Sequence, residues 1–216
     1  MKTEMNIVVR GLFATPVVAL EVPGAVERNS ALTATILRKR DETPSVQASN
    51  AGGWHSDREI LSWGGRPVVE IIEIAKEVAN RLTADRKGKP SPQTWKVMAW
   101  ANVNGPGDAN ICHYHPGAFW SGAYYVEDGG CATDPTLGGE FEMHVDTSLD
   151  IRVFAFAAAI HAPSAVATTM PATNAPANPA ALVILRFIDF LLTLIRWPQR
   201  ATGSGTSGCI LIQLDL

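Results

Sequence analysis

The sequence lacks several features that would assign it to common classes of protein. Its 216 residues include three cysteines, an odd number and too few for the disulfide framework of a secreted domain. The net charge of −3 provides no basic surface for nucleic acid or for an anionic membrane. The first residues lack the apolar core of a signal peptide, and the longest apolar block, residues 181–195, contains Arg186 and Asp189. We therefore expect a cytoplasmic protein that binds neither nucleic acid nor a membrane.

Two of the five histidines lie close together in the sequence. His113 and His115 are separated by one residue, and in an extended strand this spacing places both imidazoles on one face, with Cα atoms about 7 Å apart. Two rings on one face can converge on one metal ion. Pro116 and Gly117 follow directly and are expected to end the strand. The spacing by itself also fits a surface or packing position.

The residues around this pair resemble a bacterial family of 2-oxoglutarate- and iron(II)-dependent oxygenases in the prolyl-hydroxylase-like superfamily. The resemblance extends to about residue 143. It rests on Asn-x-Asn-x-x-Gly-Asp at 102–108, His-x-His-Pro-Gly at 113–117, Ser-Gly-x-Tyr-Tyr-Val at 121–126 and Gly-Gly-Glu-Phe-Glu-Met at 138–143. It implies Fe(II) and 2-oxoglutarate as cofactors, and hydroxylation of an unknown substrate that is either a small molecule or a protein. A homodimer is one option for its assembly.

The same resemblance implies roles for single residues. His113 and His115 are the first two metal ligands, although His115 occupies the position of the aspartate in the His-x-Asp pair of prolyl-hydroxylase-type members of the superfamily. Asn102 and Tyr124 are expected to contact the cosubstrate. Tyr124 and Tyr125 are consecutive in a strand, so only one can face the metal. We favour Tyr124 because Ser-Gly-x-Tyr resembles the strand that contacts the cosubstrate.

Hydrophobic periodicity predicts leading helices followed by strands. Residues 67–86 carry an apolar stripe at helical spacing, and a weaker one ends near Lys39 after a cap at Asn29 or Ser30. Strands are expected at 15–22, 95–104, 119–126 and 140–145. We expect one domain, residues 1–216, of mainly β class with helices (α+β). The resemblance implies a double-stranded β-helix, or jelly roll, in which helices from residues 1–94 pack on one sheet of a barrel core formed by 95–216.

The tail, residues 145–216, departs from the family pattern. The family needs a distal histidine as third ligand and usually a later arginine that binds the cosubstrate's carboxylate. His161 is one candidate for the third ligand. A second placement of the tail puts Thr193 in the histidine position and a residue near Cys209 in the arginine position, which predicts an incomplete site. A third alternative is an altered C-terminal segment.

Two other functions remain open on sequence grounds. The first is a cupin-like metal-binding protein, because Gly107 precedes the histidine pair at the cupin spacing. The glutamate expected shortly after that pair is absent, since Phe119 and Trp120 stand there. The second is a catalytically inactive jelly-roll module. His55 is expected to pack within a loop, and His144 to be exposed.

Overall fold

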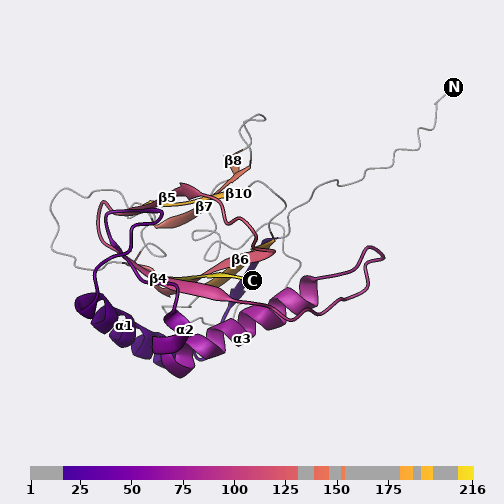
Figure 1. Ribbon diagram of the computed structural model, residues 1–216, viewed down its shortest axis with the longest axis horizontal. Coiled ribbons are helices and arrows are strands. Elements are labelled where there is room, and N and C mark those ends of the chain that lie inside the picture. Colours follow the sequence, from indigo (N-terminus) through magenta and orange to yellow (C-terminus); the bar gives the residue numbers. More distant parts are fainter. Residues whose placement is uncertain (1–16, 131–138, 146–151, 154–180, 187–190, 197–208) are drawn as a thin grey trace.

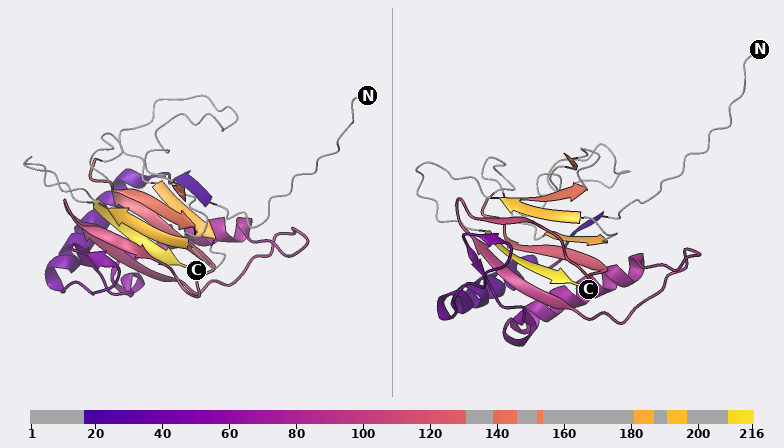
Figure 2. Two further views of the ribbon diagram at one scale, coloured as in Figure 1. Left: turned by 90° about the horizontal axis from the view of Figure 1, so that it is seen from above. Right: turned by 45° about the horizontal axis from the view of Figure 1, so that its top comes forward.

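Two antiparallel sheets face each other, and helices cover the outer side of the larger one (Figures 1 and 2). The computed structural model describes residues 17–130, 139–145, 152–153, 181–186, 191–196 and 209–216. Within these residues, no helix is long and apolar enough to span a membrane. The expected mixture of helices and antiparallel strands is confirmed.

The larger sheet has six strands in the order β1-β9-β6-β11-β4-β3. Its strands are β1 (Val17–Glu21), β3 (Trp54–His55), β4 (Met98–Asn104), β6 (Trp120–Glu127), β9 (Ala181–Arg186) and β11 (Cys209–Asp215). The smaller sheet has the order β2-β5-β10-β7-β8. Its strands are β2 (Asn50–Ala51), β5 (Ala109–His113), β7 (Glu140–Val145), β8 (Arg152–Val153) and β10 (Leu191–Arg196).

The chain alternates between the two sheets from β4 to β7, and again from β9 to β11. Strand β4 shows how side-chain alternation supports this arrangement, because neighbouring residues point to opposite faces. Ala99 and Ala101 face the helices and belong to the main hydrophobic core. Trp100 and Asn102 face the smaller sheet and are also buried. Burial on both faces agrees with the internal strand expected at 95–104, although the strand begins at Met98.

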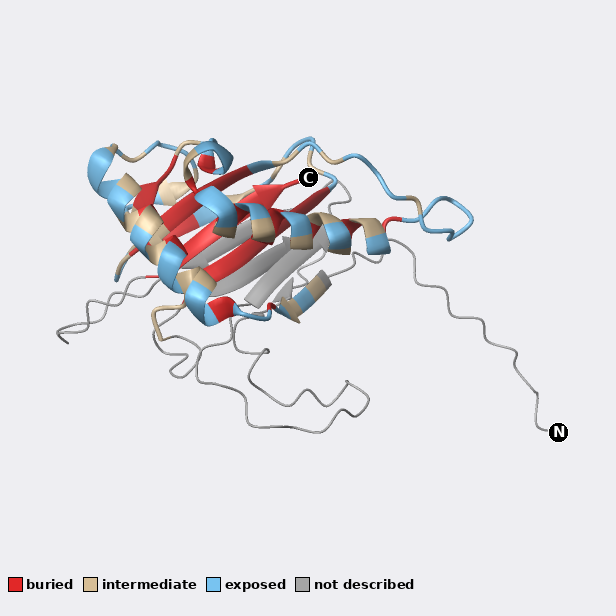
Figure 3. Cartoon of the chain, turned by 90° about the horizontal axis from the view of Figure 1, so that it is seen from below, coloured by how far each residue is buried: buried red, intermediate tan, exposed pale blue. Residues whose placement is uncertain are grey.

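The helices form a layer over the outer face of the larger sheet and lie in front of it in Figure 3. They are α1 (Ala25–Glu42), the single turn α2 (Ile60–Trp63) and α3 (Gly65–Leu82). The apolar stripe of α3 is buried as predicted, including Val68, Ile71 and Ile72, and it packs with sheet residues in one core cluster. The helices therefore lie on the side of the larger sheet that faces away from the smaller sheet.

The start of α1 differs from the expectation. The helix begins at Ala25, after Gly24 in a left-handed conformation, and not near Asn29. Asn29 lies inside the helix, and its amide nitrogen donates to the carbonyl oxygen of Val126 at 2.7 Å. The polar residue that suggested a helix cap instead anchors α1 to β6, a long-range contact that no local pattern reveals.

Candidate metal centre

His113 and His115 come together as predicted. His113 ends β5 and His115 follows two residues later, with ring centroids 4.7 Å apart and an interplanar angle of 42°. Two imidazoles that bind one ion through nitrogens about 2.1 Å away have centroids about 4.5–5 Å apart, so the separation suits a shared metal. The expected extension of the strand through His115 is wrong. The turn at Pro116 and Gly117, with Gly117 at φ 86°, already begins at His115.

Both rings direct Nδ1 at an oxygen of the protein. Nδ1 of His113 lies 2.7 Å from the carbonyl oxygen of Ile111. Nδ1 of His115 lies 2.9 Å from Oδ1 and 3.0 Å from Oδ2 of Asp215 in β11. Carbonyl and carboxylate oxygens only accept, so each Nδ1 carries a hydrogen in the neutral ring. Nε2 is therefore the nitrogen of each ring with ligand character.

The surroundings of His113 favour its neutral form. Burial lowers the pKa of His113 from its ordinary value, and the neighbouring His115 lowers it further, whereas the hydrogen bond to the Ile111 carbonyl acts in the opposite direction. A metal ion binds the neutral imidazole. The lowered pKa therefore reduces the competition between protons and metal near neutral pH.

Trp100 packs against the pair from β4. Its indole stacks on the His115 ring at a centroid separation of 5.7 Å and on the His55 ring at 5.9 Å. His55 is buried, and its Nδ1 lies 2.6 Å from the carbonyl oxygen of Ser56. These contacts agree with the packing role expected for His55, although it lies at the edge of the sheet in β3 and not in a loop.

A chain of buried amides continues from Trp100 across the sheet interior. Gln213 Oε1 accepts from Trp100 Nε1 and from Asn102 Nδ2, each at 2.9 Å. Asn110 Nδ2 donates to Asn102 Oδ1, and Asn104 Nδ2 donates to Asn110 Oδ1. Tryptophan can only donate, so the orientation of the Gln213 amide is fixed. Gln213 Nε2 has no hydrogen-bond partner among the described residues, and Asn104 Oδ1 is buried without one.

The structure reverses the expected orientation of the two tyrosines. Tyr124 faces the helices, where its hydroxyl donates to Asn29 Oδ1 at 2.7 Å. Tyr125 points to the other face of β6, and its hydroxyl donates to the Gly139 carbonyl at 3.1 Å. The prediction that Tyr124 faces the metal site is therefore wrong. The sequence does not show how the turn before β6 sets which side chains of the strand face the smaller sheet. Asn102 lies on the interior face, as a cosubstrate contact would require.

The described residues do not complete the three-residue ligand set that the resemblance implies. No group of three His, Cys, Asp or Glu side chains there can hold a metal ion. His161 and the side chain of His144 lie outside the description, so their expected roles stay predictions. On β10, Thr193 is the register partner of His113. This pairing agrees with the second placement of the tail, in which Thr193 takes the histidine position.

Strand β11 supplies no cation for a cosubstrate carboxylate. Its sequence is Cys-Ile-Leu-Ile-Gln-Leu-Asp, and Cys209, near which the arginine position was expected, is fully buried. Sequence reasoning missed the polar residues of this strand as site residues. Gln213 and Asp215 stand two positions apart in an otherwise apolar strand, which places both on one face. That spacing was the available signal.

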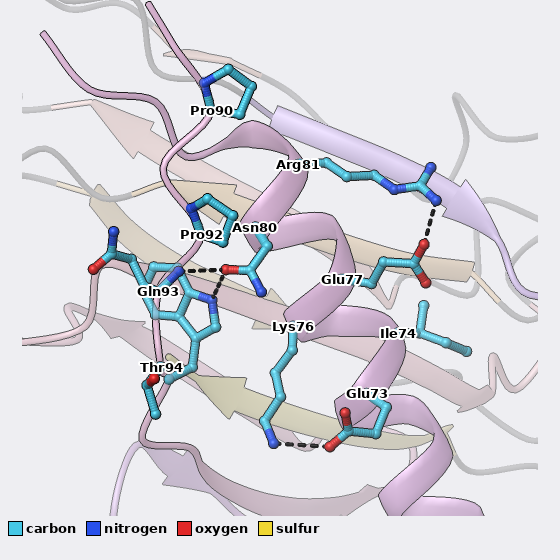
Figure 4. A pocket seen from close by; sticks show the side chains of 11 residues that line it. Glu73, Ile74, Lys76, Glu77, Asn80, Arg81, Pro90, Pro92, Gln93 and Thr94 are labelled. Carbon is cyan, nitrogen blue, oxygen red and sulfur yellow. Dashed lines mark hydrogen bonds and ion pairs between the residues drawn. The ribbon is translucent and has the colours of Figure 1, made fainter.

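A separate hollow lies outside the space between the two sheets, along α3 (Figure 4). It has a volume of about 930 Å³ and lies between α3 and the segment 90–95. Asn80 Oδ1 accepts from the backbone nitrogen of Gln93 and from Trp95 Nε1, both at 2.8 Å, and so attaches the segment to the helix. The charged residues of α3 that border the hollow form ion pairs with one another, Lys76 with Glu73 and Arg81 with Glu77. The hollow is therefore a groove on the helix side of the larger sheet, bordered by charged residues that are already paired.

Sequence comparison confirms the resemblance to the oxygenases. Residues 98–179 match the model of a family described as "Putative 2OG-Fe(II) oxygenase". This family uses Fe(II) and 2-oxoglutarate. The matched segment begins at the first residue of β4 and includes both histidines of the pair. No curated protein sequence matches the chain.

Solved structures show the same fold at low sequence identity. A prolyl hydroxylase from Trichoplax adhaerens, in complex with a peptide fragment of the hypoxia inducible factor oxygen degradation domain, aligns with a TM-score of 0.58 and 10% identity, over 92% of this chain and 82% of that one. A prolyl-4-hydroxylase from Pseudomonas putida aligns with a TM-score of 0.56 and 11% identity, over 92% of this chain and 90% of that one. The architecture is therefore that of the prolyl hydroxylases.

Proposed function

We propose that the protein is an Fe(II)- and 2-oxoglutarate-dependent oxygenase on a jelly roll. The observation that carries the proposal is the paired imidazoles of His113 and His115, 4.7 Å apart, within the segment that matches the oxygenase family. The alternation of successive strands between two facing sheets supports the jelly roll. Its substrate is either a small molecule or a protein.

In this proposal the metal is held by Nε2 of His113 and of His115, with His161 as the third ligand. Bound iron, together with 2-oxoglutarate and dioxygen, supplies the oxidising power that hydroxylates a C–H bond. Trp100 excludes water from one side of the His115 ring. His113 stays neutral because burial lowers its pKa, which keeps a lone pair available on its ring.

We assign the cosubstrate contact of β11 to Gln213. Asn102 and Trp100 both donate to Gln213 Oε1, so they turn the Nε2 group away from themselves. That group is the donor remaining for a carboxylate or carbonyl oxygen of 2-oxoglutarate. A neutral amide forms weaker bonds to a carboxylate than an arginine fork does, so we expect weaker cosubstrate binding than an arginine would provide.

The proposal is tested by converting 2-oxoglutarate to succinate with protein loaded anaerobically with Fe(II) and then exposed to air. Uncoupled succinate formation needs no knowledge of the substrate. We expect His113→Ala and His161→Ala to abolish both iron retention and succinate formation while the protein remains folded. Gln93→Ala, at an exposed position, is the control and should change neither. Absence of succinate from iron-loaded wild-type protein would refute the oxygenase.

A catalytically inactive, metal-binding jelly roll is the second candidate. It is favoured by Thr193 opposite His113 and by a β11 strand without arginine or lysine. This candidate predicts that the protein binds iron without forming succinate, and that His161→Ala leaves iron binding unchanged. A Thr193→His variant separates the two candidates further. It should strengthen metal binding if β10 occupies the position of the third ligand.

A further inference from the structure

The carboxylate of Asp215 is in direct contact with the second histidine of the pair. Both of its oxygens lie within 3.0 Å of His115 Nδ1. The side chains are 7% and 10% exposed, so water hardly screens this contact. An ionised carboxylate only accepts, and the contact therefore fixes the neutral ring of His115 as the Nδ1–H tautomer.

The carboxylate is itself held in place. Ser121 Oγ donates to Asp215 Oδ1 at 2.5 Å. Asp215 lies opposite Ser121 of β6 and Met98 of β4 in the strand register, so its backbone is paired on both sides. Trp100 stacks on the His115 ring that Asp215 contacts. The imidazole is thus fixed at its edge by Asp215 and at its face by Trp100.

We propose that Asp215 is a positioning residue for the metal centre, acting through His115. It keeps Nε2 of His115 as the ligand atom and places a negative charge one hydrogen bond away from the ligand. Two neutral imidazoles bring no negative charge to a divalent ion, whereas the His-x-Asp pair of prolyl-hydroxylase-type members of the superfamily brings one. Asp215 supplies that charge from β11, a strand of the larger sheet. The inference rests on the proposed metal site.

The first test needs no metal and no variant. In metal-free protein labelled with ¹⁵N, long-range proton–nitrogen correlation spectra distinguish the two neutral histidine tautomers. We expect the Nδ1–H form for His115 at a pH where its ring is neutral. Observation of the Nε2–H form would overturn the proposed role of Asp215, whatever the protein does with iron.

The second test measures metal affinity with Co(II), whose visible absorption reports its ligands. Removing a carboxylate that supports a ligating histidine typically weakens binding about 10–100-fold, and we expect this loss for Asp215→Asn. Asp41→Asn is the matched control, because it removes the same charge from an exposed aspartate that pairs with Arg40. It should leave the Co(II) affinity unchanged.

A double variant tests whether charge at this point is what matters. His115→Asp alone places two carboxylates side by side in a buried site, which destabilises both the fold and the ionised pair. Adding Asp215→Asn relieves that repulsion and leaves one carboxylate at residue 115, beside His113. We expect His115→Asp/Asp215→Asn to bind Co(II) more tightly than either single variant, a coupling between the two sites.

The outcomes separate the inference from the proposed function. If wild-type protein binds Co(II) and a folded Asp215→Asn variant binds it equally well, Asp215 has no positioning role and the metal site stands. If wild-type protein binds no Co(II), both the metal site and the role of Asp215 are refuted. Should Asp215→Asn fail to fold, the tautomer observed in wild-type protein still decides the question.

Discussion

Replacing Gln213 by leucine should destabilise the protein substantially, because Gln213 Oε1 accepts hydrogen bonds from two buried donors. Trp100 Nε1 and Asn102 Nδ2 would each lose a partner 2.9 Å away in a region that water does not reach. An orphaned buried donor costs about 1–3 kcal/mol, which gives about 2–6 kcal/mol for the pair. The apolar side chain of leucine offsets roughly 1–2 kcal/mol of this. The middle values of these two ranges, about 4 and about 1.5 kcal/mol, lead us to expect the free energy of unfolding to fall by about 2.5 kcal/mol.

Urea unfolding, followed by far-ultraviolet circular dichroism and by tryptophan fluorescence, measures this loss. Gln93→Leu is the matched control, because Gln93 is exposed and its side chain bonds only to Ser91. It should change the free energy of unfolding by less than about 0.5 kcal/mol. An equally small change for Gln213→Leu, with an unaltered dependence on urea, would refute the argument that Gln213 Oε1 holds two buried donors.

Three further variants test the fold and the site. Ile71→Ala, at a fully buried position of α3, should cost about 2–5 kcal/mol in thermal or urea unfolding, whereas Val69→Ala, 44% exposed, should cost less than about 0.5 kcal/mol. Tyr124→Phe should lower the free energy of unfolding by about 1 kcal/mol, because the hydrogen bond to Asn29 is lost, and should leave the Co(II) affinity unchanged. A changed Co(II) affinity would show that Tyr124 belongs to the metal site. Burial lowers the pKa of His55, so the unfolded chain takes up its proton first as the pH falls. Stability should therefore be full above about pH 6.5 and decline below it, and His55→Gln should flatten this decline in unfolding curves recorded between about pH 7.5 and 5.5.

The sequence predicted the elements whose signal is local. The apolar stripe of α3 and the alternation of β4 each repeat at the period of their own structure, and both elements lie where this periodicity places them. The approach of His113 and His115 was predictable for the same reason, because two residues only two positions apart in the chain cannot lie far from each other. Residues 98–179 also carried motifs specific enough to indicate the oxygenase family.

The parts that sequence could not predict depend on contacts between distant residues. Nothing near Asp215 in the chain indicates that it meets His115, 100 positions away. The side of β6 on which Tyr124 lies depends on how the turn after His115 enters the strand. Asn29 was predicted to be a helix cap because asparagine often caps helices. Its side chain instead donates a hydrogen bond to the carbonyl oxygen of Val126, 97 positions away. Predicting each of these contacts requires knowing which residues of distant elements lie opposite one another, and not only which residues form helices and strands.

The position of β11 in the centre of the larger sheet has a consequence for folding. This strand pairs with β4 on one side and β6 on the other, and the bond between Trp100 and Gln213 joins residues 113 positions apart. Such high contact order slows folding, because the entropy cost of closing a long loop comes before the strand forms its stabilising hydrogen bonds. Until it pairs, β4 and β6 each present an open edge on which another chain can assemble. Asp215 reaches His115 only when β11 inserts, so tight metal binding would report that this strand has paired.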